Sequence, residues 1–128
     1  MRLLLDTHPY LWLLEGDRRL SRAVAEAYED PANEFLLSVA SLWEATIKIS
    51  LGKLAISNNL AEFLERQPRE QGIAVLQIEV SHLRRLGELA HHHRDPFDRL
   101  LAAQSLAEGI PIISMDGVFD AYGVSRYW

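Results

Sequence analysis

Short apolar runs alternate with helical patterns along the whole chain, and few folds are compatible with this alternation. Apolar runs predict strands over residues 2–6, 35–39, 73–78 and 110–114, and a fifth, edge strand over residues 124–127. Strands separated by helical segments pair in parallel, with helices on both faces of the sheet. The sequence therefore predicts an α/β fold with a central parallel sheet of four to five strands.

The segments between these runs carry the start and stop signals of helices. Helices are predicted after Pro9 and over residues 21–29, 40–51, 58–67, 81–91 and 95–108, with a short helical turn over 117–122. Ser21 and Ser81 are the expected N-caps, and Pro68 and Gly109 the expected stops. With 128 residues, no internal repeat and no linker, the chain is expected to form one domain over residues 1–128.

Four acidic residues fall where the strands of such a sheet would end. Asp6 closes the first strand, Glu44 lies early in the helix after the second, Asp98 begins the helix before the fourth, and Asp116 follows the fourth. In open parallel sheets, ligands bind beyond the carboxyl ends of the strands. Four carboxylates gathered there repel one another unless a cation neutralises them, and oxygen ligands favour Mg²⁺ or Mn²⁺. Water molecules on such an ion are suited to phosphodiester hydrolysis.

Each of these acids except Asp6 also has a purely structural interpretation. Residues 41–44 read as a capping box in which Glu44 serves the start of a helix, and Asp95 with Asp98 has the same appearance. Asp116 precedes a glycine and fits an N-cap or a turn. Asp6 has no such role, because an acid gains nothing obvious from closing an apolar strand.

Two further features are expected to be structural. Consecutive histidines at 91–93 do not converge on a metal as an i, i+4 pair does, so they predict a solvated loop. Trp43 is expected to pack in the core or in a dimer interface.

Composition excludes several classes of site. The chain has no cysteine, which excludes disulfides, thiolate zinc sites, iron–sulfur clusters and a cysteine nucleophile. Its net charge of −5 argues against binding of polyanions by the surface as a whole. No apolar run approaches the roughly 20 residues of a membrane span, and the amino terminus does not fit a signal peptide, so a soluble cytoplasmic protein is expected.

Several stretches together resemble a known family. The stretches LLLDTHPYLWLL, SVASLWEATIKISLGKL and HHHRDPFDRLLAAQSLAEGIPIISMDGVFDAYGV are similar to PIN domains, and more narrowly to the toxin ribonucleases of VapBC type II toxin–antitoxin modules. The resemblance runs over residues 1–128. It implies a PIN-like three-layer α/β/α sandwich whose parallel sheet usually has five strands.

The resemblance also implies a site. Carried over by motif, the acids of the family fall on Asp6, Glu44, Asp98 and Asp116. Asp6, Asp98 and Asp116 would hold Mg²⁺ or Mn²⁺, with Thr7 and Ser114 as hydroxyls beside the site and Asp95 as the cap of its helix. The implied activity is endoribonucleolytic cleavage of RNA. The implied partners are a VapB-like antitoxin that inserts a basic segment among the acids and a second copy of the chain in a homodimer.

Three other interpretations fit the alternating architecture. A receiver domain of a signalling pair needs a lysine after the last strand, whereas Lys48 and Lys53 both lie in the first half. A phosphohydrolase with an aspartate nucleophile needs D-x-D after the first strand, whereas Asp6 is followed by Thr7 and His8. The third is a catalytically silent PIN-like module that binds RNA or protein.

Overall fold

A five-stranded parallel sheet organises the chain. In the computed structural model, which describes all residues Met1–Trp128, the strands are β1 (Arg2–Leu5), β2 (Glu34–Ser38), β3 (Ala74–Leu76), β4 (Ile112–Ile113) and β5 (Arg126–Tyr127). Their order is β3-β2-β1-β4-β5, and every neighbouring pair is parallel. The predicted sheet is confirmed, with five strands and β5 at an edge.

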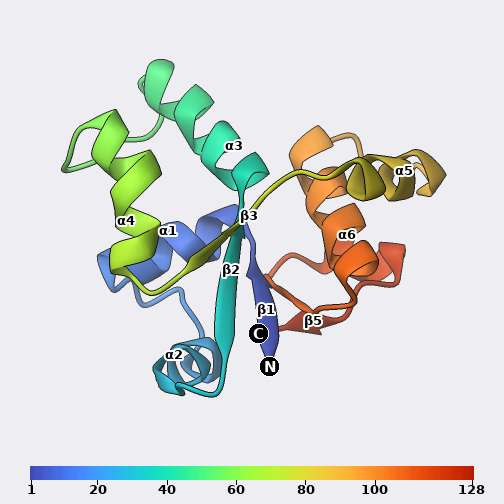
Figure 1. Cartoon of the computed structure of the whole chain (residues 1–128), viewed down its shortest axis with the longest axis horizontal. Helices are drawn as coiled ribbons and strands as arrows, with labels where there is room; N and C mark the ends of the chain where they lie inside the picture. Colours follow the sequence, from blue (N-terminus) through green and yellow to red (C-terminus); the bar gives the residue numbers. More distant parts are fainter.

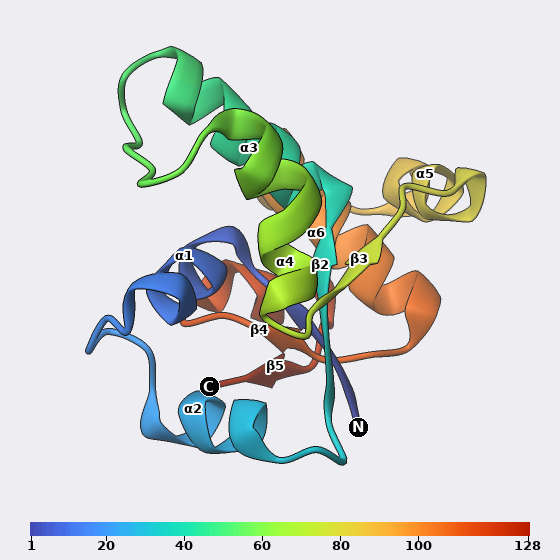
Figure 2. The same ribbon diagram turned by 60° about the vertical axis from the view of Figure 1, so that its left-hand side comes forward.

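Helical segments connect the strands. They are α1 (Thr7–Glu15), α2 (Arg22–Glu29), α3 (Val39–Ser50), the π-helical η1 (Glu62–Arg66), α4 (Gln67–Glu70), α5 (Val80–Glu88), α6 (Pro96–Glu108) and the 3₁₀-helical η2 (Gly117–Tyr122). Figure 1 shows α1, α2 and α4 on one side of β1 and β2, and α5 and α6 on the other. Seen from the second direction, α3 continues directly from the end of β2 (Figure 2).

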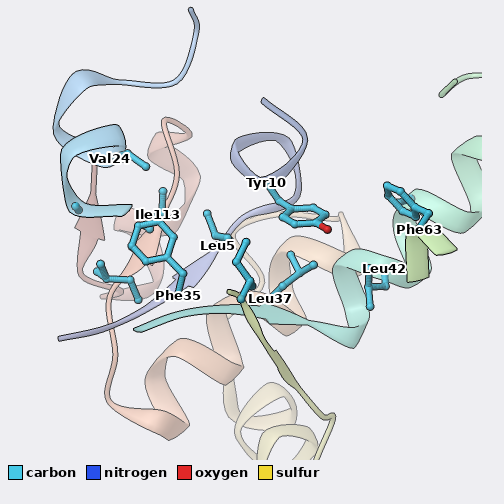
Figure 3. Close-up of a cluster of buried hydrophobic side chains, with 12 residues drawn as sticks. Leu5, Tyr10, Val24, Phe35, Leu37, Leu42, Phe63 and Ile113 are labelled. Carbon is cyan, nitrogen blue, oxygen red and sulfur yellow. The ribbon is translucent and has the colours of Figure 1, made fainter. Parts of the chain in front are cut away.

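The sheet is covered on both faces, and its inner strands β1, β2 and β4 each contribute side chains to two hydrophobic clusters. In β1, Leu3 and Leu5 belong to the cluster under α1 and α2, whereas Leu4 belongs to the cluster under α6. Figure 3 shows Leu5 in the first cluster, beside Leu37 of β2. Because side chains alternate along a strand, covering both faces requires apolar residues at successive positions. The three-layer α/β/α sandwich is confirmed.

The direction of the chain across the sheet reverses beside β1. From β1 the chain builds outward through β2 to β3, and then returns to β4 on the other side of β1. The edge beyond the carboxyl ends of β1 and β4 is therefore the topological switch point, where open α/β sheets bind ligands. Asp6 follows β1 directly, and Ser114 follows β4 directly.

Several helix boundaries differ from the prediction. The first helix begins at Thr7 rather than after Pro9, with Asp6 as its N-cap. The helix predicted over 58–67 is present but shifted: helical structure runs from Leu60 to Glu70 and passes through Pro68, the expected stop, which lies in the first turn of α4. Proline is tolerated there because the amide at that position needs no intrahelical partner.

The start of α5 also differs. Its N-cap is Glu79 rather than Ser81, because the buried ring of His82 accepts a hydrogen bond at Nδ1 from the Glu79 amide, 2.9 Å away. None of the helices combines the length and the apolar character that a membrane span requires.

Tyr10 → Phe is expected to leave the stability unchanged or to raise it by about 1 kcal/mol. The Tyr10 hydroxyl is buried in the first cluster without a hydrogen-bond partner, and burial raises its pKa. Removing the hydroxyl removes a desolvation cost that no hydrogen bond offsets, while the ring keeps its contacts. Denaturant unfolding of both chains measures the difference, and a loss above about 1 kcal/mol would show that the hydroxyl has a partner.

Candidate active site

Asp6 is held in one orientation at the switch point. The residue is only 8% exposed. Its Oδ1 accepts a hydrogen bond from the Thr7 amide and its Oδ2 accepts one from the Ser114 hydroxyl, both at 2.8 Å. Burial raises the pKa of Asp6, and these two bonds act in the opposite direction. A buried carboxylate with fixed oxygens is costly to the fold, which is typical of a functional acid.

Ser114 connects Asp6 to Asp116. Its buried Oγ, besides donating to Asp6, accepts a hydrogen bond from the Asp116 amide at 3.0 Å. The Asp116 carboxylate caps η2, because its Oδ1 accepts from the Val118 amide at 3.0 Å. The cap predicted for Asp116 is therefore present. In the same position, Asp116 lines a cleft at the carboxyl edge of the sheet.

Glu44 does not cap its helix, so the capping-box interpretation of residues 41–44 is wrong. Helix α3 begins at Val39 with Ser38 as N-cap, which places Glu44 in the second turn. Its Oε1 accepts a hydrogen bond of 2.7 Å from the buried Thr7 hydroxyl, and its Oε2 lies 3.1 Å from Nζ of Lys48. Thr7 of α1 and Lys48 of α3 thus fix both oxygens of the Glu44 carboxylate.

Asp95 caps its helix as predicted, whereas Asp98 lines the cleft and contacts a histidine. Asp95 is the N-cap of α6, and its Oδ1 accepts from the amides of Phe97 and Asp98 at 2.8 and 3.2 Å. Asp98 points away from the helix end toward His93, whose Nε2 lies 3.0 Å from its Oδ2. Burial, followed by the charges of Asp95 and Asp6, raises the pKa of Asp98 to about 7, although His93 opposes the shift.

These acids line one cleft of about 590 Å³ at the carboxyl edge of the sheet. Its wall contains the five acids Asp6, Glu44, Asp95, Asp98 and Asp116 together with Ser114. Thr7 is buried behind Glu44. The structure therefore brings every predicted site residue to one place. The acids offer carboxylate oxygens as ligand atoms, and His93 offers a ring nitrogen. One ligand atom from each of His93, Asp95 and Asp98 lies within 4.8 Å of the other two. This donor set fits a hard divalent cation.

Several residues of the site were not predicted, among them two with charged side chains and a histidine. Lys48 and Arg19 line the cleft, and His93 contacts Asp98. Lys48 carries a signal in the sequence, because a residue four positions after Glu44 lies on the same helix face. A loop is present over residues 91–93, as predicted, but that prediction does not indicate a contact between His93 and the site. The local sequence around Arg19 does not indicate a contact with the site either.

Trp43 lies beside the site rather than in the core. Its side chain is 55% exposed and packs edge-to-face against Phe97, with ring centroids 4.9 Å apart. Packing of Trp43 in the core, one of the two predicted alternatives, is wrong, because α3 turns this position outward beside the start of α6.

The cation affinity of this cleft is expected to fall about tenfold between pH 8 and pH 6. Because folding raises the pKa of Asp98 to about 7 from an ordinary value of 3.8, the metal-free folded chain holds a proton there that the unfolded chain has released. That proton stabilises the metal-free chain as the pH falls from about 8 toward 5, and it competes with the cation. Calorimetric titration with Mn²⁺ at both pH values measures the effect.

Two variants calibrate this measurement. Asp98 → Asn should bind Mn²⁺ weakly at both pH values, whereas Asp120 → Asn, which changes an exposed acid paired with Arg126, should keep the dependence of the native chain. Equal affinity of the native chain at pH 6 and pH 8 would show that no group with a pKa near 7 faces the cation.

The fold and the cleft define an α/β protein with an acidic centre at the switch point of its sheet. A family model described as PIN domain matches residues 3–124, and the chain belongs to this family. Membership rules out the receiver-domain and aspartate-nucleophile interpretations. No curated protein sequence matches the chain.

Solved structures with the same fold come from toxin–antitoxin systems. The chain is similar to VapBC2 from Rickettsia felis bound to a DNA fragment from their promoter, with a TM-score of 0.73, 14% identity and coverage of 100% of this chain and 99% of that chain. VapBC-1 from nontypeable Haemophilus influenzae gives a TM-score of 0.71, 17% identity and coverage of 99% and 97%. VapC20 of Mycobacterium tuberculosis, a sarcin–ricin loop cleaving toxin, gives 0.66, 19% identity and coverage of 95% of each chain.

Proposed function

We propose that this PIN domain is a Mg²⁺- or Mn²⁺-dependent endoribonuclease and the toxin of a type II toxin–antitoxin module. The observation that carries the proposal is the convergence of five carboxylates from four separate segments in one cleft, where burial, followed by the charges of Asp95 and Asp6, raises the pKa of Asp98 to about 7. Such a cluster is costly without a cation, and it offers the oxygen ligands that Mg²⁺ and Mn²⁺ prefer.

Asp6, Asp98 and Asp116 are the residues that would hold the cation. When bound, the cation supplies positive charge for the phosphate oxygens and water of lowered pKa. Ser114 keeps Oδ2 of Asp6 in place, and the cap of η2 keeps Asp116 in place. Asp95 orients the first turn of α6 and so the position of Asp98.

Glu44 is the residue that would orient the attacking water and accept its proton. Thr7 and Lys48 each engage one oxygen of Glu44, and each oxygen keeps a further lone pair for water. The water oxygen bonds to phosphorus, the bond from phosphorus to the 3′-oxygen breaks, and this oxygen leaves as a 3′-hydroxyl. The other product is a 5′-phosphate. A 2′,3′-cyclic phosphate would require attack by the 2′-hydroxyl instead.

The proposed partners follow from the similar structures and from the charge of the site. Several of these structures are toxin–antitoxin complexes. An antitoxin with a basic segment would neutralise the acids of the cleft and occupy the place of the cation. We also propose a homodimer, with the exposed Trp43 as a candidate interface residue, and action in the cytoplasm, where an RNA substrate is available.

The experiment that tests the proposal is cleavage of total bacterial RNA by the purified chain, freed of any antitoxin. Reactions with Mg²⁺ or Mn²⁺ are compared with EDTA and with Glu44 → Gln, and the cut ends are mapped. Discrete cuts that carry 5′-phosphates and disappear in both controls support the proposal. Cuts that persist in EDTA contradict it, and binding of RNA without any cleavage supports the silent-module alternative instead.

A further inference from the structure

A second hollow, of about 520 Å³, lies next to the cleft and is lined only by basic residues and histidines. Its wall consists of His91, His92, His93, Arg94 and Arg99. The first four come from the loop between α5 and α6, and Arg99 comes from the first turns of α6. We refer to these five residues as the basic hollow. In a chain with a net charge of −5, it is a local reversal of the overall charge.

The two arginines of the basic hollow carry charge that no carboxylate neutralises. Six other arginines of the chain form ion pairs with Asp or Glu, whereas Arg94 and Arg99 form none. Arg94 is exposed. Arg99 is positioned by neutral groups: its guanidinium donates to the Ala90 carbonyl at 2.8 Å and lies 5.8 Å from the ring centroid of Tyr122. A guanidinium fixed by neutral partners remains available to an anion.

The basic hollow adjoins the acidic cleft. His93 belongs to its wall and contacts Asp98, which lines the acidic cleft, through the 3.0 Å contact of its Nε2. The two surfaces therefore share a border. A linear polyanion with one phosphate at the acids would have to place its next phosphates on a neighbouring surface, and this neighbouring surface is cationic.

An aromatic surface lies in the same place. The His92 ring packs against Tyr122 with centroids 5.3 Å apart, and His92 is exposed. Proteins that bind single-stranded nucleic acids combine a cationic groove for the backbone with rings on which bases stack. The basic hollow has both components within five residues and Tyr122.

We propose that the basic hollow binds the phosphate backbone of single-stranded RNA next to the scissile bond, with Arg94 and Arg99 on phosphates and His92 under a base. The inference rests on the proposed nuclease function and assigns its substrate-binding track. An acidic protein segment is the competing ligand. It would explain the charge of the basic hollow, but it would not explain why the hollow adjoins a cleft that is proposed to act on phosphodiesters.

The test measures binding of an 8-nucleotide single-stranded RNA to the folded chain in Mg²⁺. The Glu44 → Gln background prevents cleavage during the titration. Arg94 → Gln is the test variant, because Arg94 is exposed and has no ion-pair partner to lose. Arg69 → Gln on α4 is the matched control, since Arg69 is also exposed and without an ion pair and lies on the other side of the sheet. Cleavage of the same RNA is measured without the Glu44 change.

Arg94 → Gln is expected to weaken RNA binding about fivefold at moderate salt. It should also reduce the slope of log affinity against log salt by about 0.7, the value for one lost phosphate contact on a single strand. In the cleaving chain, KM rises and kcat stays close to its original value, whereas Arg69 → Gln changes none of these quantities.

Two results overturn the inference. Equal RNA affinity and salt slope for Arg94 → Gln and Arg69 → Gln, in a chain that cuts RNA, would remove the basic hollow from the substrate site and leave the nuclease proposal intact. Weaker binding of the antitoxin, with unchanged binding of RNA, would make the hollow a protein-docking site. Failure of the native chain to cut any RNA counts against the nuclease proposal instead, because the binding titration does not depend on cleavage.

Discussion

Asp6 → Asn is expected to lower metal-dependent RNA cleavage by at least about a hundredfold, while the chain stays folded. The side chain keeps its size, and its oxygen can still accept the hydrogen bond from the Thr7 amide, while its NH2 group takes the place of the oxygen that accepts from Ser114, so that the Ser114 hydroxyl would have to accept there instead. The variant loses the negative charge that would hold the cation. Because burial raises the pKa of Asp6, the charged form is disfavoured by the fold. The metal-free variant should therefore be at least as stable as the native chain.

Cleavage rates in saturating Mn²⁺ and denaturant unfolding in EDTA measure both parts of this prediction. Asp30 → Asn is the control, because Asp30 is an exposed acid after α2, before β2 begins and therefore away from the carboxyl edge of the sheet. This control should retain the native rate. An Asp6 → Asn variant that cuts RNA at the native rate would show that Asp6 is not part of the active site.

Leu5 → Ala is expected to destabilise the chain by about 3 kcal/mol. Leu5 is fully buried in β1, the central strand, and packs in the first hydrophobic cluster beside Leu37 and Ile113 (Figure 3). Truncation loses the transfer free energy of the side chain and leaves a cavity that the neighbouring strands cannot close. Since Leu5 directly precedes Asp6, the cavity also loosens the strand end that positions the acid.

The matched control for Leu5 is Val75 → Ala on the edge strand β3. Val75 is 38% exposed, so its truncation should cost less than about 1 kcal/mol. Chemical denaturation of the two variants gives both values. Similar losses at the two positions would contradict the assignment of β1 as the centre of the core.

The order of strands and helices was predictable because it rests on continuous apolar runs that only a doubly covered sheet can bury. Leu3, Leu4 and Leu5 are a direct example, since successive side chains enter different clusters. The acids were predictable for a related reason. Asp6 interrupts such a run at its end, where burial of a carboxylate is costly. The structure adds a structural role that was not predicted, because Asp6 is also the N-cap of α1.

The predictions that failed concern interactions between distant segments. The start of α3 depends on Ser38 rather than Ser41, so Glu44 is free to meet Thr7, a residue 37 positions earlier. The helical structure that begins at Leu60 does not stop at Pro68, because the first turn of α4 accepts a proline. Local sequence does not determine which of several serines caps a helix when tertiary contacts decide the outcome.

The histidine loop shows the same limit. Solvation of the loop over 91–93 is correct for His91 and His92, which are exposed. The position of His93 against Asp98 depends on how the loop returns to α6, and Arg99 sets this return through its hydrogen bond to the Ala90 carbonyl. No spacing rule for metal or catalytic histidines describes this arrangement, because it depends on a contact between the loop and Arg99, which lies four positions after the N-cap Asp95.

We propose that the acids of the cleft hold the cation on which RNA cleavage depends. The most direct test is to measure Mn²⁺ binding by electron paramagnetic resonance and RNA cleavage by the same samples across one range of Mn²⁺ concentrations. Cleavage is expected to saturate together with occupancy of the protein site, and Asp6 → Asn should lose both. Cleavage at an undiminished rate in EDTA, or Mn²⁺ binding unchanged by Asp6 → Asn, would contradict the claim.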